Sequence, residues 1–311
     1  KVEGRNAIRI VAPKKKKLVS SMKVSGFTFL RNGTILGYPY VESLKSLLAV
    51  CDEVIVALGN SDDDTLEQVQ AINDPKLRII QTTWNENMQD RGYTYAQQKM
   101  IAQFNCTGDW AFYLEGDEVI HEQDYATIRA SMEKHLDDKA VEALVFDYYH
   151  FYGSPSTYAY SPRWYRRAPR IIRNTVRSWA PDGLFWLIMN ENKQGRYPNA
   201  ALAGCHLYHY GHVRSVAKMN EKHKRVAHYW GQKLPEFEGY GDIDPQSIRK
   251  FTNSHPTILQ HWLSHDAEQQ FIVNPDYSLS KRDKKHRLVS KLEKLLGGKD
   301  FTKKHYKLIR K

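Results

Sequence analysis

The 311-residue sequence has few cysteines, no long apolar run and no glycine-rich dinucleotide-binding loop. Its 3 cysteines are too few and too far apart for a disulfide framework or a CxxC zinc site, which fits a reducing, cytoplasmic compartment. No apolar run approaches the roughly 18 residues of a transmembrane helix. No apolar segment follows the basic residues 14–17, so we expect no signal peptide. The missing GxGxxG pattern disfavours a dehydrogenase.

The positive charge is concentrated at the two ends of the chain. The formal net charge is +11. Residues 1–23 hold eight Lys or Arg and one Glu, and residues 281–311 hold thirteen against three acids, so residues 24–280 carry a net charge of −6. An acidic body without a helix-turn-helix, zinc-finger or RNP-like pattern argues against a nucleic-acid partner, although the basic termini keep that function as an alternative.

Strand-like and helix-like segments alternate from residue 24 onward. Apolar runs and helical spacing predict strands and helices in turn at 24–30, 40–49, 53–58, 63–72, 77–81, 93–104 and 110–114. This alternation is typical of an α/β protein with a mostly parallel sheet and helices on both faces. Ligands of such sheets bind beyond the carboxyl ends of the strands.

The rest of the chain has a less regular pattern. We expect a helix at 122–135, a strand at 143–152, loops at 153–205 and helices at 216–232, 256–270 and 284–296. The last of these is a basic amphipathic helix, which is typical of a segment on an anionic membrane surface. We therefore expect a flexible basic leader, a catalytic domain, a helical extension and a basic amphipathic tail, at 1–23, 24–215, 216–280 and 281–311.

Two groups of carboxylates follow predicted strands. Glu115, Asp117 and Glu118 come directly after strand 110–114, and acids spaced i and i+2 on an extended turn can hold Mg²⁺ or Mn²⁺, which in turn binds phosphate. A solvated acidic loop that caps a helix is an equally simple interpretation. For residues 62–64, an N-cap with an acidic first turn is the favoured interpretation.

In four segments the chain resembles family 2 glycosyltransferases of the GT-A fold. Residues 31–32 follow the first strand, residues 60–65 follow the second, residues 98–99 lie in the third helix, and residues 114–118 come at the end of the fourth strand. The last looks like the D-x-D signature of that family, with Glu115 in its first place. Leu58 and Gly59 stand where the family often has two Asp, so the nucleotide base stays open.

The resemblance implies transfer of a sugar from a nucleotide-diphosphate donor to an acceptor hydroxyl, usually with inversion, with Mg²⁺ or Mn²⁺ as cofactor. Carried over to this chain, the donor-binding residues are Leu30, Arg31, Asn32, Asn60, Asp63, Arg91, Gln98, Lys99 and Glu115. The implied metal ligands are Asp117 and a residue further along the chain. Among His206, His209 and His212, which a strand would place on different faces, we favour His209.

The resemblance also implies a carboxylate base on the acceptor side, after an Arg-rich strand. Asp182 is the candidate, although its Pro-Asp-Gly context also fits a simple turn. Arg170, Arg173 and Trp179 are the candidates for binding the acceptor or phosphate, since Arg holds phosphate bidentately; surface ion pairs and core packing are the alternatives.

The expected function is therefore an inverting, metal-dependent glycosyltransferase. Together with the tail, the resemblance suggests lipopolysaccharide, O-antigen or capsule assembly on a glycan or lipid-linked acceptor, at the inner face of the membrane. A sugar-phosphate nucleotidyltransferase is the alternative, but the glycine-rich basic loop of those enzymes is missing after the first strand.

Overall fold

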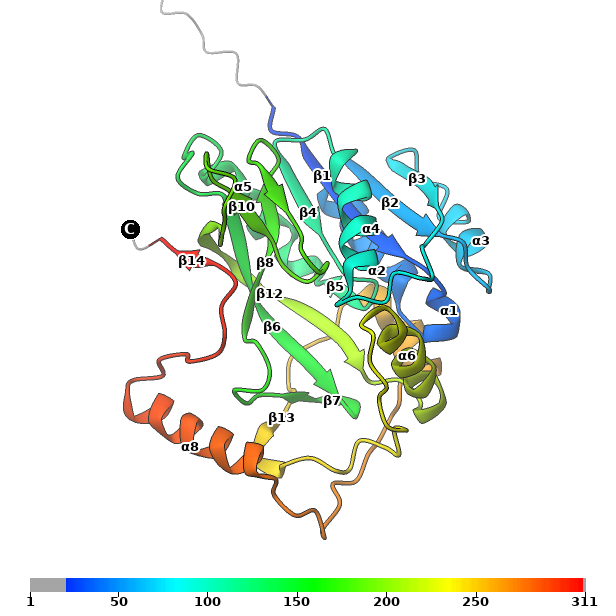
Figure 1. The fold of residues 1–311 in the computed structure, drawn as a ribbon, viewed down its shortest axis with the longest axis vertical. Coiled ribbons are helices and arrows are strands. Elements are labelled where there is room, and N and C mark those ends of the chain that lie inside the picture. The colour runs from blue at the N-terminus through cyan, green and yellow to red at the C-terminus, as the bar shows by residue number, and fades with distance from the viewer. Residues whose placement is uncertain (1–20, 310–311) are drawn as a thin grey trace, which may run out of the picture.

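The computed structural model describes residues 21–309, so the predicted leader lies almost entirely outside the described residues. One large curled sheet runs through the molecule, and its first half is parallel (Figure 1). The strand order in this half is β4-β1-β2-β3, with all neighbours parallel. Its strands are β1 (Val24–Leu30), β2 (Glu53–Gly59), β3 (Leu77–Thr82) and β4 (Trp110–Tyr113).

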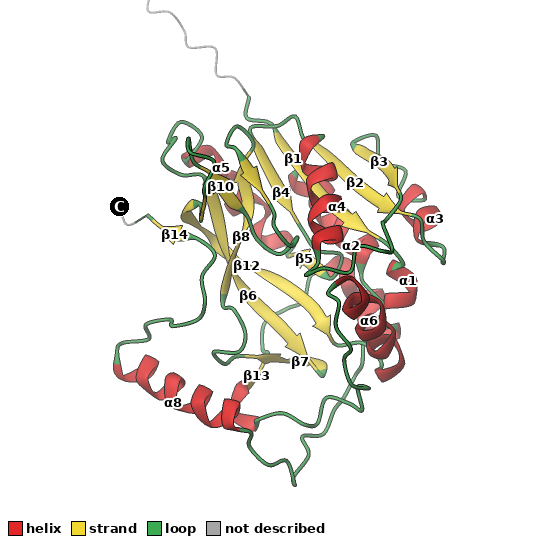
Figure 2. Ribbon diagram, in the orientation of Figure 1, coloured by secondary structure: helices red, strands yellow, loops and turns green. Residues whose placement is uncertain are grey.

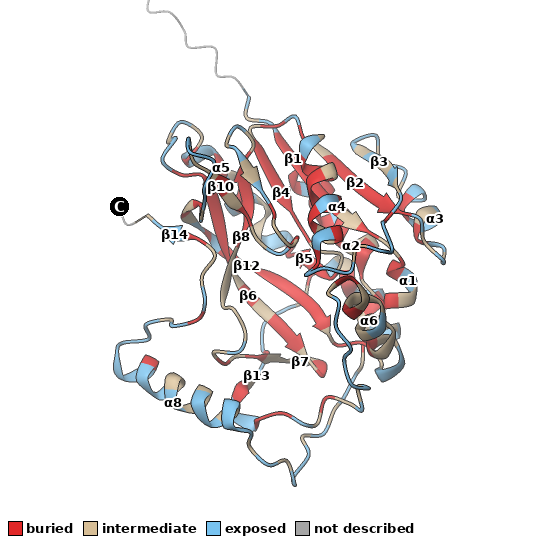
Figure 3. Cartoon of the chain, in the orientation of Figure 1, coloured by how far each residue is buried: buried red, intermediate tan, exposed pale blue. Residues whose placement is uncertain are grey.

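Helices cover both faces of this parallel half (Figure 2). On one face α2 and α5 bury an apolar cluster against β1, β2 and β6, and on the other α4 packs against β1 and β2. The helices of this part of the chain are α1 (Gly33–Leu36), α2 (Tyr40–Val50), α3 (Thr65–Gln70), α4 (Tyr93–Phe104) and α5 (Tyr125–Lys134). Because both faces are covered, β2 is apolar at successive positions and is almost wholly buried (Figure 3). The predicted α/β class is confirmed.

Beyond β4 the sheet is mixed, so "mostly parallel" holds only for the first half. β8 runs antiparallel to both β4 and β6, whereas β12 runs parallel to β6 and antiparallel to β5. β7 and β13 extend the sheet antiparallel beyond β6. The strands are β5 (Glu118–Ile120), β6 (Ala143–Tyr152), β7 (Ser154–Ala159), β8 (Arg167–Arg173), β12 (Asn199–His212) and β13 (Ile248–Lys250).

The loops predicted at 153–205 are wrong in large part. This region contains β7, β8, the start of β12 and a separate three-stranded sheet of β9 (Ser178–Trp179), β10 (Leu187–Met189) and β11 (Gly195–Arg196). Its strands escape the sequence pattern because buried positions hold Arg, Pro and Ser as well as apolar residues. In β12, register shifts break the alternation of inward and outward residues.

Besides β13, the described C-terminal region contributes the α-helices α6 (Val216–Tyr229), α7 (Gln260–His265) and α8 (Lys281–Leu295) and the short strand β14 (Lys307–Leu308). The helices predicted at 216–232 and 284–296 form as α6 and α8, the latter starting at a capping box between Ser280 and Asp283. The long helix predicted at 256–270 is wrong. A 3₁₀ turn at Thr257–Leu259 leads into α7, which ends where Ala267 bridges to Arg214.

The tail is only partly separate from the sheet. α8 stands away from it, whereas β14 returns and pairs in parallel with β12 (Figure 1). Among the described residues, no helix is both long and apolar enough to cross a membrane.

Candidate functional site

A cavity of about 310 Å³ lies beyond the carboxyl ends of β1 and β4, with α6 as its opposite wall. Charged or imidazole groups reach it from four places: the turn after β1, the turn after β4, β12 and α6. The rest of its wall is largely aromatic, with Phe29, Tyr38, Trp84, Tyr95, Tyr113 and Trp230. An apolar pocket with a few convergent charged groups is the usual form of a small-molecule site.

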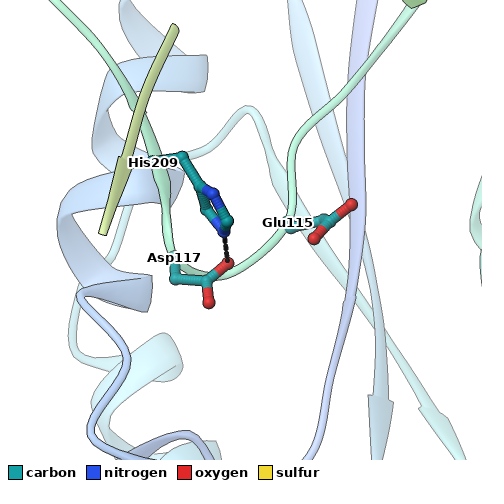
Figure 4. Close-up of side chains that lie close together, drawn as sticks. All are labelled: Glu115, Asp117 and His209. Carbon is teal, nitrogen blue, oxygen red and sulfur yellow. Dashed lines mark ion pairs between the residues drawn. The ribbon is translucent and has the colours of Figure 1, made fainter. Parts of the chain in front are cut away.

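Three candidate metal ligands meet at this cavity (Figure 4). Glu115 and Asp117 come from the turn after β4, and His209 comes from β12, which pairs with β5 directly after that turn. One ligand atom from each residue lies within 4.8 Å of the other two. Two carboxylates and an imidazole suit a divalent cation such as Mn²⁺. The predicted Asp117 and His209 therefore lie together.

The hydrogen bonds of a second histidine orient His209. His150 Nε2 lies 2.7 Å from the Tyr165 carbonyl oxygen, which can only accept, so Nε2 carries the proton. Burial first, and then the nearby His209, hold the pKa of His150 well below its usual value, so its Nδ1 is free to accept from His209 Nδ1 at 2.8 Å. His209 Nε2 is thereby directed at Asp117 Oδ1, 3.5 Å away, as metal binding requires.

Two cations also approach Asp117, and sequence reasoning missed both. Arg214 Nη2 lies 3.0 Å and Lys222 Nζ 3.3 Å from Asp117 Oδ2. Burial alone would raise the pKa of Asp117, but Lys222, His209 and Arg214 outweigh burial and hold it well below its usual value. The only sign of these two cations in the sequence is that both closely follow β12, the strand that carries the three histidines. Asp117 is thus ionised and surrounded by groups that can also bind phosphate.

Arg170 is buried beside the turn and connects its acidic residues. It donates to both carboxylate oxygens of Glu118, at 2.8 and 2.7 Å, and to Glu115 Oε1 at 2.8 Å. Burial and then Glu118 raise the pKa of Glu115, and Arg170 opposes this rise. Glu118 is fully buried, so its role is to hold Arg170 rather than to bind a ligand.

Of the predicted donor-binding residues, three line the cavity: Leu30, Arg31 and Glu115. Arg31 and Asn32 also line an adjoining cavity of about 340 Å³ under α6. Arg31 Nε donates to the Asn60 carbonyl oxygen at 2.8 Å, and the Asn32 N–H donates to Ser61 Oγ at 3.0 Å. These bonds join the ends of β1 and β2.

The remaining donor candidates do not line the cavity. Asp63 Oδ2 accepts from the Ile35 N–H at 2.8 Å, so its carboxylate ties the loop after β2 to α1. Buried Gln98 accepts from Thr82 Oγ1 at 2.6 Å. Arg91 is exposed, and its partner is the neighbouring Asp90.

Lys99 is buried and holds the loop that carries Asp182. Its Nζ donates to the Gly183 carbonyl oxygen at 3.0 Å and lies 4.0 Å from the ring centres of Tyr113 and Trp186. Burial first, and then Arg170, put its pKa well below the usual value. Lys99 is therefore a positioning residue, because Gly183 and Leu184 line the cavity whereas Lys99 does not.

Asp182 does not itself line the cavity; it lies in the turn that its sequence context suggests, directly before Gly183 and Leu184, which do line it. Its Oδ1 accepts from the Leu184 N–H at 2.9 Å, and its neighbour Gly183 has a left-handed φ of 81°. The second oxygen, Oδ2, takes part in no hydrogen bond among the described residues. The turn and a catalytic role are thus compatible, and the latter stays a prediction.

The structure does not bring Arg173 and Trp179 to the site. β8 runs antiparallel to β4, so Arg173 lies opposite Trp110 at the start of β4, at the far end from the carboxylates. Its guanidinium donates to four backbone carbonyl oxygens, at His135, Leu136, Asp138 and Val141. Trp179 is 37% exposed in the small sheet.

Comparison with known proteins agrees with the resemblance seen in the sequence. Residues 40–189 match the model described as glycosyl transferase family 2. This range includes Glu115, Asp117 and Asp182 but ends before His209. No curated protein sequence matches the chain.

Several solved structures resemble part of the chain. Staphylococcus aureus TarS 1–349 has 21% identity and a TM-score of 0.35, over 49% of this chain and 47% of that one. A mannosyltransferase from Pyrobaculum calidifontis with GDP-Man and Mn²⁺ has 23% identity and a TM-score of 0.30, over 40% and 34%. Mycobacterium tuberculosis glucosyl-3-phosphoglycerate synthase with Mn²⁺ and UDP has 16% identity and a TM-score of 0.28, over 41% and 44%. The chain thus spans less than half the length of each.

Proposed function

We propose that this chain, whose residues 40–189 match the model of glycosyl transferase family 2, transfers a sugar from a nucleotide-diphosphate donor to an acceptor hydroxyl. The observation that carries the proposal is the meeting of Glu115, Asp117 and His209 at a mostly aromatic cavity beyond the strand ends. We assign residues 24–215 as the catalytic domain. Residues 216–280 then contribute α6, which closes the cavity.

The donor set supports Mn²⁺ over Mg²⁺, because an imidazole nitrogen joins the two carboxylates. When bound, the metal supplies Lewis-acid stabilisation of the diphosphate. Arg214 and Lys222 would then stabilise the same negative charge, since both already lie within 3.3 Å of Asp117. The aromatic wall excludes water from the reacting sugar.

Inversion follows from a one-step displacement, in which a base on the acceptor side takes the proton of the attacking hydroxyl. Asp182 is our candidate for that base. Within residues 21–309 its Oδ2 makes no hydrogen bond, while its Oδ1 is fixed by the turn and its loop is anchored by buried Lys99. Proton transfer of this kind contributes roughly 10²–10⁴-fold to a rate.

The test is release of a nucleoside diphosphate from a panel of sugar nucleotides, measured with Mn²⁺, after EDTA, and after Mn²⁺ is restored. We expect release from one nucleotide class, loss with EDTA and recovery with Mn²⁺. Pyrophosphate release from a nucleoside triphosphate and a sugar phosphate would instead favour the nucleotidyltransferase. No release from any donor would contradict the proposal.

We further propose that α8 holds the enzyme at an anionic membrane surface. Polar side chains attach this helix to the body: Arg287 makes two hydrogen bonds with Asp244, and buried Glu293 pairs with Arg166 at 2.6 Å. Its apolar side is left exposed, with Leu288, Leu292 and Leu295 exposed by 59%, 44% and 80%. Exposed leucines flanked by lysines are complementary to a lipid surface.

Such a location suits a cytoplasmic step in surface-glycan assembly, such as lipopolysaccharide, O-antigen or capsule, with a glycan or lipid-linked acceptor. Co-sedimentation with phosphatidylglycerol vesicles tests the attachment. We expect that replacing Leu288, Leu292 and Leu295 by Ser abolishes binding, whereas Leu234→Ser, at a leucine that is 47% exposed elsewhere, leaves it unchanged. Unchanged binding of the triple variant would refute the attachment.

A further inference from the structure

A second cavity of about 250 Å³ lies against the first and shares Glu115 and Leu184 with it. Four segments far apart in the sequence form its wall: the turn after β4, the loop before β8 with β8 itself, the loop before β10, and the C-terminal segment before β14. We call it the basic cavity. Its place beside Glu115 puts it next to the proposed sugar-transfer site.

The basic cavity has an excess of positive charge. Glu115 is its only carboxylate, whereas Arg163, Arg167, Arg170 and Lys303 all line it. Arg167 is paired with Asp147, and Arg170 with Glu115 and Glu118. Within residues 21–309, the side chains of Arg163 and Lys303 have no ion pair and no hydrogen bond, so their charges are available to a ligand.

An aromatic pair forms another part of the wall. The ring centres of Phe185 and His305 lie 4.2 Å apart in a stacked arrangement, and buried His305 Nε2 has no hydrogen-bond partner in the part of the chain that the structure describes. Burial first, and then Lys303, lower the pKa of His305, although Asp182 opposes this. A buried ring nitrogen close to Lys303, in a cavity that Arg163 also lines, suits an anionic group that accepts hydrogen bonds.

We propose that the basic cavity binds a phosphate group on the acceptor and thereby directs the acceptor hydroxyl toward the donor. That the ligand is an acceptor rests on the proposed function, whereas the binding of a phosphate in this cavity does not. The two cavities meet at Glu115, so an acceptor anchored by Arg163 and Lys303 extends toward the reacting centre. Such an acceptor is either a free phosphorylated sugar or a lipid-linked phosphate.

Binding is tested by NMR of the full-length protein with ¹³C-labelled histidine rings. The probes are glucose 6-phosphate for the free sugar and decyl phosphate, below its micelle concentration, for the lipid. We expect the His305 signal, assigned with His305→Gln, to shift with at least one phosphate probe and not with glucose. Whichever probe binds more tightly identifies the source of the phosphate.

Variants separate the basic cavity from the donor cavity. Loss of one charge-assisted contact in Lys303→Ala is expected to raise the Kd of the bound probe about tenfold. Lys299→Ala, at an exposed lysine of the same segment that does not line the cavity, should leave the Kd unchanged. Arg163→Ala, in a segment remote in sequence, gives a second reading if Lys303→Ala perturbs the C-terminal fold.

Three results would overturn the inference: no shift of His305 with either phosphate, a shift confined to His209 in the donor cavity, or a Kd unaffected by both Lys303→Ala and Arg163→Ala. Donor turnover by the wild-type protein is measured separately. If turnover is absent but His305 shifts, the proposed function fails and the phosphate site stands; the reverse result refutes the site alone.

Discussion

The two halves of the sheet are built from different kinds of residue. In the parallel half, β2 is buried through consecutive apolar side chains, and its stability comes from burial of apolar surface. In the mixed half, buried positions of β8 and β12 carry Arg170 and His209, which need partners to offset their loss of hydration. The proposed site lies at the junction, where the turn after β4 meets β12. The proposed chemistry would thus take place where the fold accommodates buried charged groups.

The largest effect is expected at that junction. Asp117→Asn removes the charge that Arg214, Lys222 and His209 surround, so we expect metal-dependent donor turnover to fall by more than about 10⁴-fold. The measurement is nucleotide release at saturating Mn²⁺, with Asp90→Asn as an exposed control. Full activity of Asp117→Asn would show that the junction is not the active site.

On the acceptor side, Asp182→Asn is expected to lower the rate of sugar transfer by roughly 10²–10⁴-fold without weakening the binding of the donor. The amide oxygen can still accept from the Leu184 N–H, so the turn is kept. Transfer rate and donor Kd are measured together, with exposed Glu191→Gln as control. Near-normal transfer would exclude Asp182 as the base.

In the mixed half, His150→Phe removes the acceptor that orients His209. Loss of such a supporting hydrogen bond typically weakens metal affinity about 10–100-fold. Mn²⁺ binding followed by electron paramagnetic resonance measures this directly. His206→Gln is the control, since His206 belongs to β12, as His209 does, but stacks on Tyr149. Equal Mn²⁺ affinity in both variants would remove the role given to His150.

Low pH should lower the free energy of unfolding through buried histidines of the mixed half. Burial lowers the pKa of His255 to about 4 and puts those of His150 and His212 well below the usual value. Between pH 6.5 and 4 the unfolded chain therefore binds more protons than the folded chain, so the free energy of unfolding falls as the pH drops. Urea unfolding at pH 7, 6 and 5 measures this. His255→Gln should flatten the profile, and an unchanged slope would refute the contribution of His255.

The smallest effect is expected in the parallel half. Ile55→Val removes one buried methylene from β2 and should lower the free energy of unfolding by about 1 kcal/mol. Donor turnover should stay at the wild-type level, because Ile55 lies in the core rather than at the strand end. A large loss of donor turnover in Ile55→Val with normal stability would show that the parallel half contributes directly to activity, against this comparison.

The same contrast explains what the sequence could predict. The parallel half was predictable because each strand is a short apolar run and each helix has one apolar side. β7 and β8 were not, since their buried Arg, Pro and Ser resemble a loop until their partners are known, and the start of β12 was not, since register shifts break its alternation. Asp117 and His209 could be proposed from the resemblance. Lys222, Arg214 and His150 could not, because only the three-dimensional pairing brings them to the turn after β4.

Thermal melting with sugar nucleotides tests the central claim most directly. UDP, GDP, CDP, CMP and dTDP sugars are compared with and without Mn²⁺, for the wild-type protein and for Asp117→Asn. We predict that one nucleotide class raises the melting temperature of the wild-type protein only when Mn²⁺ is present, and that Asp117→Asn loses this shift. Equal stabilisation with and without Mn²⁺, or none by any nucleotide, would contradict a metal-dependent donor site at the junction.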